Sequence, residues 1–134
     1  MNLVDTSAWV DYLRAAPTPA TAALRELLST EPGRVAICEP IAMELLAGAG
    51  EGIRLARLEH LVNGLPSLSV EPATDFRAAA TIYRAGRRAG LTIRSLVDCL
   101  IAAQAIRHDV ALIHKDVDYE VIAQLTPLRA ISLR

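Results

Sequence analysis

Short, mostly apolar segments alternate with amphipathic helical segments along the whole chain, and this alternation constrains the fold more than any other feature. The apolar segments are too short for buried helices and are typical of strands; they are Leu3–Val4, Arg34–Ile37, Leu68–Val70, Val110–Ile113 and Ala130–Leu133. The helical segments run to about Arg14 and then over Thr21–Ser29, Ile41–Ala47, Ile53–Val62, Ala73–Ala89, Ser95–Arg107 and Asp116–Gln124. Strands that alternate with helices form a parallel sheet covered on both faces. The sequence therefore predicts one α/β domain over residues 1–134, with a central parallel sheet flanked by helices.

Composition and charge exclude several classes of protein. With 52% hydrophobic and 22% charged residues the chain is globular, and no apolar run reaches the roughly 18 residues of a membrane span. Cys38 and Cys99 lie in apolar segments without metal-ligand spacing, and no secretion signal is visible, so a cytoplasmic protein with reduced thiols is expected. A net charge of −1 argues against a protein that coats nucleic acid, but not against an enzyme that cuts it.

Two acidic residues lie at or just after the ends of predicted strands. Asp5 comes after the Leu3–Val4 segment, and Asp116 comes two residues after the Val110–Ile113 segment and its His114. Because the carboxyl ends of parallel strands meet at one edge of a sheet, both acids belong to that edge. Each is also well placed to cap the helix that follows it, so an N-cap and a metal ligand are both open interpretations.

Two further acids lie inside predicted helices. Asp98 stands three residues after Ser95, the spacing of a capping box, although that box prefers Glu or Gln. Glu44 lies past the first turn of an apolar helix, where a carboxylate is costly to bury without a partner. No Lys or Arg stands between Arg34 and Arg54, so a hard divalent cation is its natural partner.

Four local strings resemble the motif regions of PIN-domain ribonucleases, and more closely those of the VapC-type toxins of bacterial toxin–antitoxin pairs. The strings are VDTSAWVDYLR, PIAMELLAG, TIRSLVDCLIAAQA and ALIHKDVDYEVIA, and they span the chain in the order, spacing and total length of that family. The resemblance implies a metal-dependent endoribonuclease that uses Mg²⁺ or Mn²⁺ and leaves a 5′-phosphate and a 3′-hydroxyl. It also implies a cognate antitoxin and a homodimer.

The resemblance assigns the metal site to four acids, namely Asp5, Glu44, Asp98 and Asp116. Our hypothesis is that Asp5 and Asp98 hold the principal ion. Glu44 and Asp116 then orient water or complete a second site about 4 Å away. No catalytic His or Lys is needed for this chemistry.

Other residues beside these acids are candidates for supporting roles. Thr6 and Ser7 are expected either to donate hydrogen bonds to Asp5 or to a phosphate, or only to cap a helix. Arg94 is a candidate contact for a substrate phosphate or an antitoxin acid, with a solvated arginine as the alternative. His114 stands where relatives carry Thr or Ser, and Asp118 is expected to be solvated, with a substitute metal ligand as the alternative.

A groove for an antitoxin helix is the second candidate feature. Trp9, Tyr12 and Leu13 are candidates to line it, although core packing explains Trp9 equally well.

Three other functions remain open on sequence alone. One is a PIN-fold RNA-processing nuclease that is not a toxin. Another is a phosphoryl-transfer domain of receiver or haloacid-hydrolase type, which is disfavoured because Asp5 stands alone and is followed by Thr6-Ser7 rather than by a DxDxT motif. The last is a non-enzymatic α/β binding module whose acids only cap helices.

Overall fold

The computed structural model describes residues 1–134 and confirms the expected α/β architecture. Its sheet has four parallel strands in the order β2-β1-β3-β4. The strands are β1 (Asn2–Val4), β2 (Val35–Ala36), β3 (Ala111–His114) and β4 (Ala130–Ser132). The strand predicted over Arg34–Ile37 is shorter than expected, because Arg34 belongs to a short 3₁₀ turn, Pro32–Arg34.

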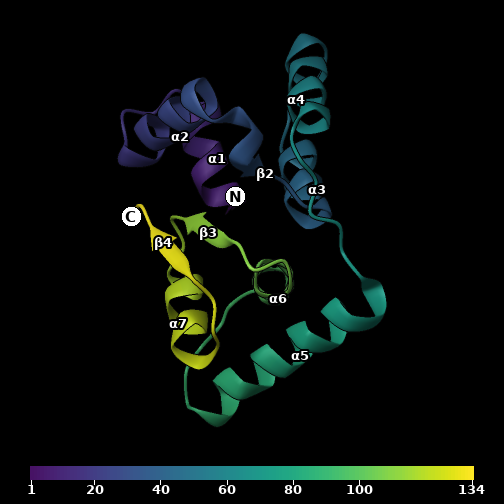
Figure 1. Ribbon diagram of the computed structural model, residues 1–134, viewed down its shortest axis with the longest axis vertical. Helices are drawn as coiled ribbons and strands as arrows, with labels where there is room; N and C mark the ends of the chain where they lie inside the picture. The colour runs from purple at the N-terminus through teal and green to yellow at the C-terminus, as the bar shows by residue number, and fades with distance from the viewer.

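Seven helices surround this sheet. They are α1 (Thr6–Leu13), α2 (Pro19–Thr30), α3 (Glu39–Ala47), α4 (Ile53–Gly64), α5 (Pro72–Arg88), α6 (Leu96–Arg107) and α7 (Val117–Leu125). Figure 1 shows α1 and α2 together near the amino terminus, α3 and α4 together on the other side of the view, and α5 running across the bottom, below α6. None of these helices has the length and apolar character needed to cross a membrane.

The core lies where the central strands meet the helices. Leu3, Val4 and Leu112 are fully buried in β1 and β3, and β1 pairs with β3 through Leu3 and Leu112. Trp9 of α1 is also fully buried, so its role is core packing. Cys38 and Cys99 are free and buried, which confirms the expectation from sequence.

The strand predicted over Leu68–Val70 is absent. A single parallel bridge joins Ile37 to Ser67, and the chain then leaves the sheet. Side chains satisfy the backbone of the next residues: Glu39 accepts a hydrogen bond from the Val70 amide at 2.9 Å, and Arg107 donates to the Ser69 carbonyl at 2.7 Å. Strand pairing is therefore replaced by side-chain hydrogen bonds, which an apolar pattern does not reveal.

The parallel topology determines where the acids meet. Strands β1 and β3 are neighbours, with Val4 opposite Ile113, and Asp5 and Asp116 follow their carboxyl ends. The Asp5 amide donates to the Ile113 carbonyl at 2.9 Å, which anchors the start of α1 to β3. The expected common edge is therefore present.

Candidate metal centre

Asp5 both caps helix α1 and lies near the other buried acids at this sheet edge. Its Oδ2 accepts hydrogen bonds from the Ser7 amide at 2.9 Å and from the Ser7 hydroxyl at 2.5 Å, which caps α1. Its Oδ1 accepts a hydrogen bond from the buried hydroxyl of Tyr119 at 2.7 Å. The two interpretations left open by the sequence are therefore compatible, because each oxygen faces a different neighbour.

Asp98 turns away from its helix terminus. The Ser95 hydroxyl accepts from the Asp98 amide at 3.4 Å, so Ser95 is the N-cap of α6. The Asp98 carboxylate does not return to Ser95, as a capping box requires, but contacts the Tyr119 hydroxyl at 3.2 Å. It is 7% exposed and points into the cluster.

Asp116 and Asp118 lie beside Asp98, and Arg94 forms an ion pair with each of Asp116 and Asp118. Ligand oxygens of the three aspartates all lie within 4.8 Å of one another, a spacing that a single cation can span. Arg94 donates to Asp116 Oδ1 at 2.9 Å and to Asp118 Oδ1 at 3.1 Å, and its amide donates to Asp118 Oδ2 at 3.1 Å. The expectation that Asp118 is solvated is wrong, because Arg94 stabilises its carboxylate in a position that is 2% exposed.

Glu44 reaches the cluster from α3 without a cationic partner. Thr6 donates a hydrogen bond to Glu44 Oε1 at 2.7 Å and not to Asp5, which differs from the expectation from sequence. Ser7 does donate to Asp5, as expected. Glu44 is half-buried and forms no ion pair. Its burial and the nearby charges of Asp5 and Asp116 raise its pKa above the ordinary value.

The His114 imidazole hydrogen-bonds to the backbone and is not exposed to solvent. Its ring is fully buried, and its Nδ1 accepts a hydrogen bond from the Asp116 amide at 3.1 Å, while its Nε2 has no partner. Burial lowers the pKa of this imidazole, which favours the neutral form. His114 therefore helps to position Asp116 and is too deeply buried to touch a substrate phosphate.

Burial and the crowding of carboxylates raise the pKa of Asp98 most clearly. Burial, followed by the charges of Asp5 and Asp116, raises it from 3.8 to about 8. Burial, followed by the charges of Asp5 and Asp98, holds the pKa of Tyr119 well above its ordinary value, so its hydroxyl keeps its proton and donates. Arg94 pairs with Asp116 and Asp118 but with none of Asp5, Glu44 and Asp98, so the site has a deficit of positive charge. Oxygen donors of this kind suit Mg²⁺ or Mn²⁺.

Tyr119 is the site residue that the sequence did not reveal. An aromatic residue in the first turns of an apolar helix is typical of core packing, and its ring does lie against His114, with centroids 5.2 Å apart. The sequence signal that distinguishes it is its phenolic hydroxyl, since a buried hydroxyl needs a partner. The cluster of acids provides that partner.

Known proteins with similar sequences belong to one family. Residues 3–125 match the PIN domain family. The chain is 59% identical over 134 residues, the full length of both proteins, to VapC ribonuclease Mb1587 of Mycobacterium bovis, and equally to ribonuclease VapC11 of Mycobacterium tuberculosis. Ribonuclease VapC18 of M. tuberculosis is 30% identical over 92% of this chain and 88% of its own length.

Solved structures share the fold at lower sequence identity. A toxin–antitoxin complex from Klebsiella pneumoniae contains a chain that superposes with a TM-score of 0.75 at 19% identity, with 100% of this chain and 98% of that chain covered. M. tuberculosis VapC20, a toxin that cleaves the sarcin–ricin loop, superposes with a TM-score of 0.67 at 15% identity, with 96% and 99% covered. The full-length match at 59% identity is the decisive one, and it shows that the chain belongs to the VapC ribonucleases of the PIN-domain family.

Proposed function

We propose that this chain is a Mg²⁺- or Mn²⁺-dependent endoribonuclease whose metal is held by Asp5 and Asp98, with Glu44 and Asp116 in support, and that a cognate antitoxin inhibits it. The observation that carries the proposal is the gathering of acids at one sheet edge. Asp98, Asp116 and Asp118 lie within 4.8 Å of one another, and the Tyr119 hydroxyl joins Asp5 to Asp98. Glu44 lies near enough to Asp5 and Asp116 for their charges to raise its pKa, and Arg94 is the only cation paired with any of these acids. Burial of so many carboxylates without a compensating cation is unfavourable, and a bound divalent ion removes that cost.

Each acid has a distinct part in this proposal. A bound divalent cation lowers the pKa of a water and polarises a phosphoryl oxygen. Asp5 and Asp98 hold it through oxygens that face the cluster. Glu44 would accept a hydrogen bond and then a proton from the attacking water, with Oε2 the freer of its oxygens because Oε1 already accepts one from Thr6. The water oxygen would bond to phosphorus as the water gives up a proton to Glu44, and the bond from phosphorus to the 3′-oxygen would break. That 3′-oxygen would take up a proton, leaving a 5′-phosphate and a 3′-hydroxyl.

Metal binding by the purified chain is the first test. Calorimetry with Mn²⁺ at pH 7 should show saturable binding that is lost in Asp5→Asn and Asp98→Asn, with circular dichroism confirming that both variants remain folded. Because the Asp98 pKa lies at about 8, binding should also release close to one proton, measured from the enthalpy in buffers of different ionisation heat. Equal binding in wild type and variants rules out the assignment.

RNA cleavage is the second test, and it follows metal binding because a missed substrate makes a negative result uninformative. Cleavage should require Mg²⁺ or Mn²⁺, stop in excess EDTA and leave 5′-phosphate ends. Loss of metal binding with retained cleavage would contradict the mechanism.

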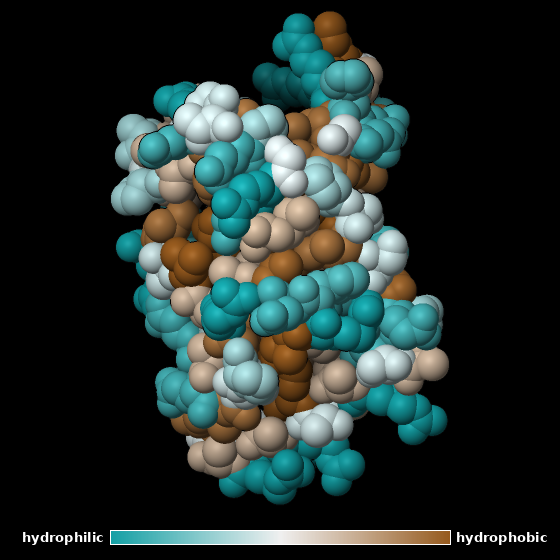
Figure 2. Space-filling view, in the orientation of Figure 1, coloured by the Kyte–Doolittle hydropathy of each residue, from teal (hydrophilic) through white to brown (hydrophobic).

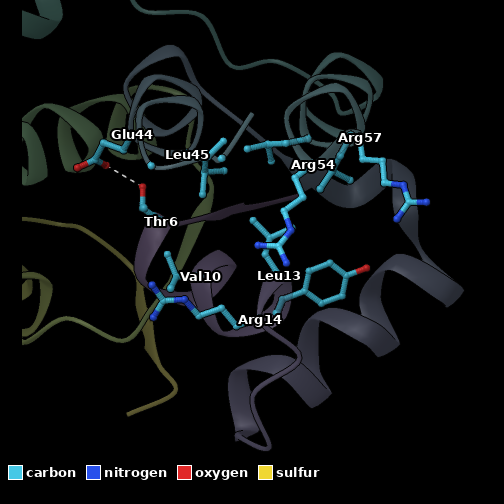
Figure 3. A pocket seen from close by; sticks show the side chains of 14 residues that line it. Thr6, Val10, Leu13, Arg14, Glu44, Leu45, Arg54 and Arg57 are labelled. Carbon is cyan, nitrogen blue, oxygen red and sulfur yellow. Dashed lines mark hydrogen bonds between the residues drawn. The ribbon is translucent and has the colours of Figure 1, made fainter. Parts of the chain in front are cut away.

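The antitoxin part of the proposal is supported by a groove beside the metal centre. The groove has a volume of about 820 Å³ and lies between α1 and the pair α3–α4. Its apolar lining includes Val10, Tyr12, Leu13, Leu45, Leu58 and Leu61. Figure 3 shows Thr6 and Glu44 at one end, so an occupant of the groove lies next to the acids.

The charge of the groove selects an amphipathic, acidic segment. Arg14, Arg54 and Arg57 line it, and none of them forms an ion pair within the chain. In the region of α3 and α4, Figure 2 shows brown apolar side chains beside teal polar ones. A helix with one apolar face and acids along its edge matches both features. Tyr12 and Leu13 therefore keep their predicted place in the groove, whereas Trp9 is in the core.

The homodimer is the remaining part of the proposal. Met43 of α3 and Leu96 of α6 are each 57% exposed, and a homodimer interface would cover large apolar side chains of this kind. Sedimentation of the isolated chain should give a dimer, and Met43→Lys should shift it toward the monomer. A monomer in the wild type at micromolar concentration rules this part out.

A further inference from the structure

The hydroxyl of Tyr119 contacts both acids that are proposed to hold the principal ion. It lies 2.7 Å from Asp5 Oδ1 and 3.2 Å from Asp98 Oδ1. These residues come from three separate parts of the fold, because Asp5 follows β1, Asp98 is on α6 and Tyr119 is on α7. No other side chain hydrogen-bonds to both acids.

The remaining lone pairs of Asp5 make this contact important. Each carboxylate oxygen accepts about two hydrogen bonds or metal bonds. Oδ2 of Asp5 already receives two donors from Ser7, one from the amide and one from the hydroxyl. The unused acceptor site of Asp5 therefore lies on Oδ1, the oxygen that Tyr119 holds.

The ring of Tyr119 is itself immobilised. It is fully buried and lies 5.2 Å from the His114 ring, tilted by 54°. The same His114 accepts the amide hydrogen of Asp116. The hydroxyl therefore has a fixed position between Asp5 and Asp98.

We propose that Tyr119 is a positioning residue for the metal centre, whose hydroxyl orients Asp5 Oδ1 and the Asp98 carboxylate toward a shared divalent cation. This inference rests on the proposed function of the same acids. Hydrogen-bond partners of ligating residues fix ligand orientation, and their removal typically weakens metal affinity by about 10- to 100-fold. Tyr119 acts only through these acids and does not touch the reacting atoms.

The test is the variant Tyr119→Phe, which removes one oxygen and keeps the packed ring. Calorimetry with Mn²⁺ alone should give a dissociation constant raised by about tenfold or more relative to wild type. Cleavage at saturating Mn²⁺, measured over a range of RNA concentrations, should show a lower kcat with little change in KM, because the acids are misaligned but RNA contacts remain. Denaturant unfolding in EDTA establishes that the variant is folded.

Tyr83→Phe is the matched control, since this half-buried tyrosine of α5 makes no hydrogen bond to the acids. It should bind Mn²⁺ as the wild type does. Wild-type affinity in Tyr119→Phe, or equal losses in both variants, overturns the inference while the proposed function stands. Absence of Mn²⁺ binding in the wild type itself instead overturns the proposed function, so the two failures are distinguishable.

Discussion

Replacing Asp98 by Asn should stabilise the metal-free protein and at the same time abolish its stabilisation by metal. Asp98 is 7% exposed and lies among like charges, so its ionised form destabilises the folded state. Asparagine has nearly the same shape without the charge. The substitution therefore separates the effect of the Asp98 carboxylate on folding stability from its role as a metal ligand.

The magnitude follows from the pKa of Asp98, which is about 8 in the folded chain against an ordinary value of 3.8. Between these values the folded state retains a proton that the unfolded chain releases. The stability contributed by this group is complete below pH 3.8 and is lost as the pH rises through 8. Each pH unit lowers the free energy of unfolding by at most about 1.4 kcal/mol, or about 4 kcal/mol from pH 5 to pH 8. Solvent screening reduces the expected loss to roughly 2 kcal/mol.

The assay is urea unfolding in EDTA at several pH values from 5 to 8, for wild type and Asp98→Asn. The difference between the two proteins isolates Asp98, because His114 and Glu44 are present in both. The lowered pKa of His114 makes stability rise with pH and the raised pKa of Glu44 makes it fall, and each effect cancels in the difference. Asp109→Asn is the control, since the side chain of Asp109 is 94% exposed.

Two results would refute the reasoning about Asp98. One is a wild-type stability that stays level or rises from pH 5 to pH 8 relative to the variant. The other is stabilisation of Asp98→Asn by Mn²⁺ to the same extent as the wild type.

Further predictions concern arginines with different partners. Arg107→Met should lower the free energy of unfolding by about 2–3 kcal/mol, measured with urea, because it leaves Asp75, which is 1% exposed, as an unpaired buried charge; an unchanged midpoint contradicts this. Arg94→Ala should lower the melting temperature yet tighten Mn²⁺ binding at least threefold by calorimetry, because it removes a competing cation from two carboxylates; weaker binding would instead make this arginine part of the site. The double reversal Arg54→Glu and Arg57→Glu should weaken binding of the cognate antitoxin at least tenfold while Mn²⁺ affinity is unchanged. The control is the double reversal Arg87→Glu and Arg88→Glu in the last turn of α5. Full antitoxin affinity in the first variant removes the groove from the proposal.

The sequence was sufficient for the fold class and for the edge at which the acids meet, because both follow from the alternation of strands and helices. Asp5 and Asp116 come directly after adjacent parallel strands, so their proximity needs no tertiary information. The segment Leu68–Val70 could not be separated from a strand, since the Leu68 amide still bonds to the Ile37 carbonyl while its other backbone partners are side chains from α3 and α6. Asp118 could not be predicted as buried, since its partner Arg94 is 24 residues away.

Helix capping explains how this fold brings acids together without destabilising each helix. Asp5 and Asp116 both cap their helices, through bonds to the amides of Ser7 and Asp118. The positive end of each helix stabilises the charge that the cluster otherwise disfavours. Asparagine caps a helix about as well as aspartate does. Asp5→Asn therefore retains the cap of α1, so a loss of metal binding in that variant reports the missing charge and not a frayed helix.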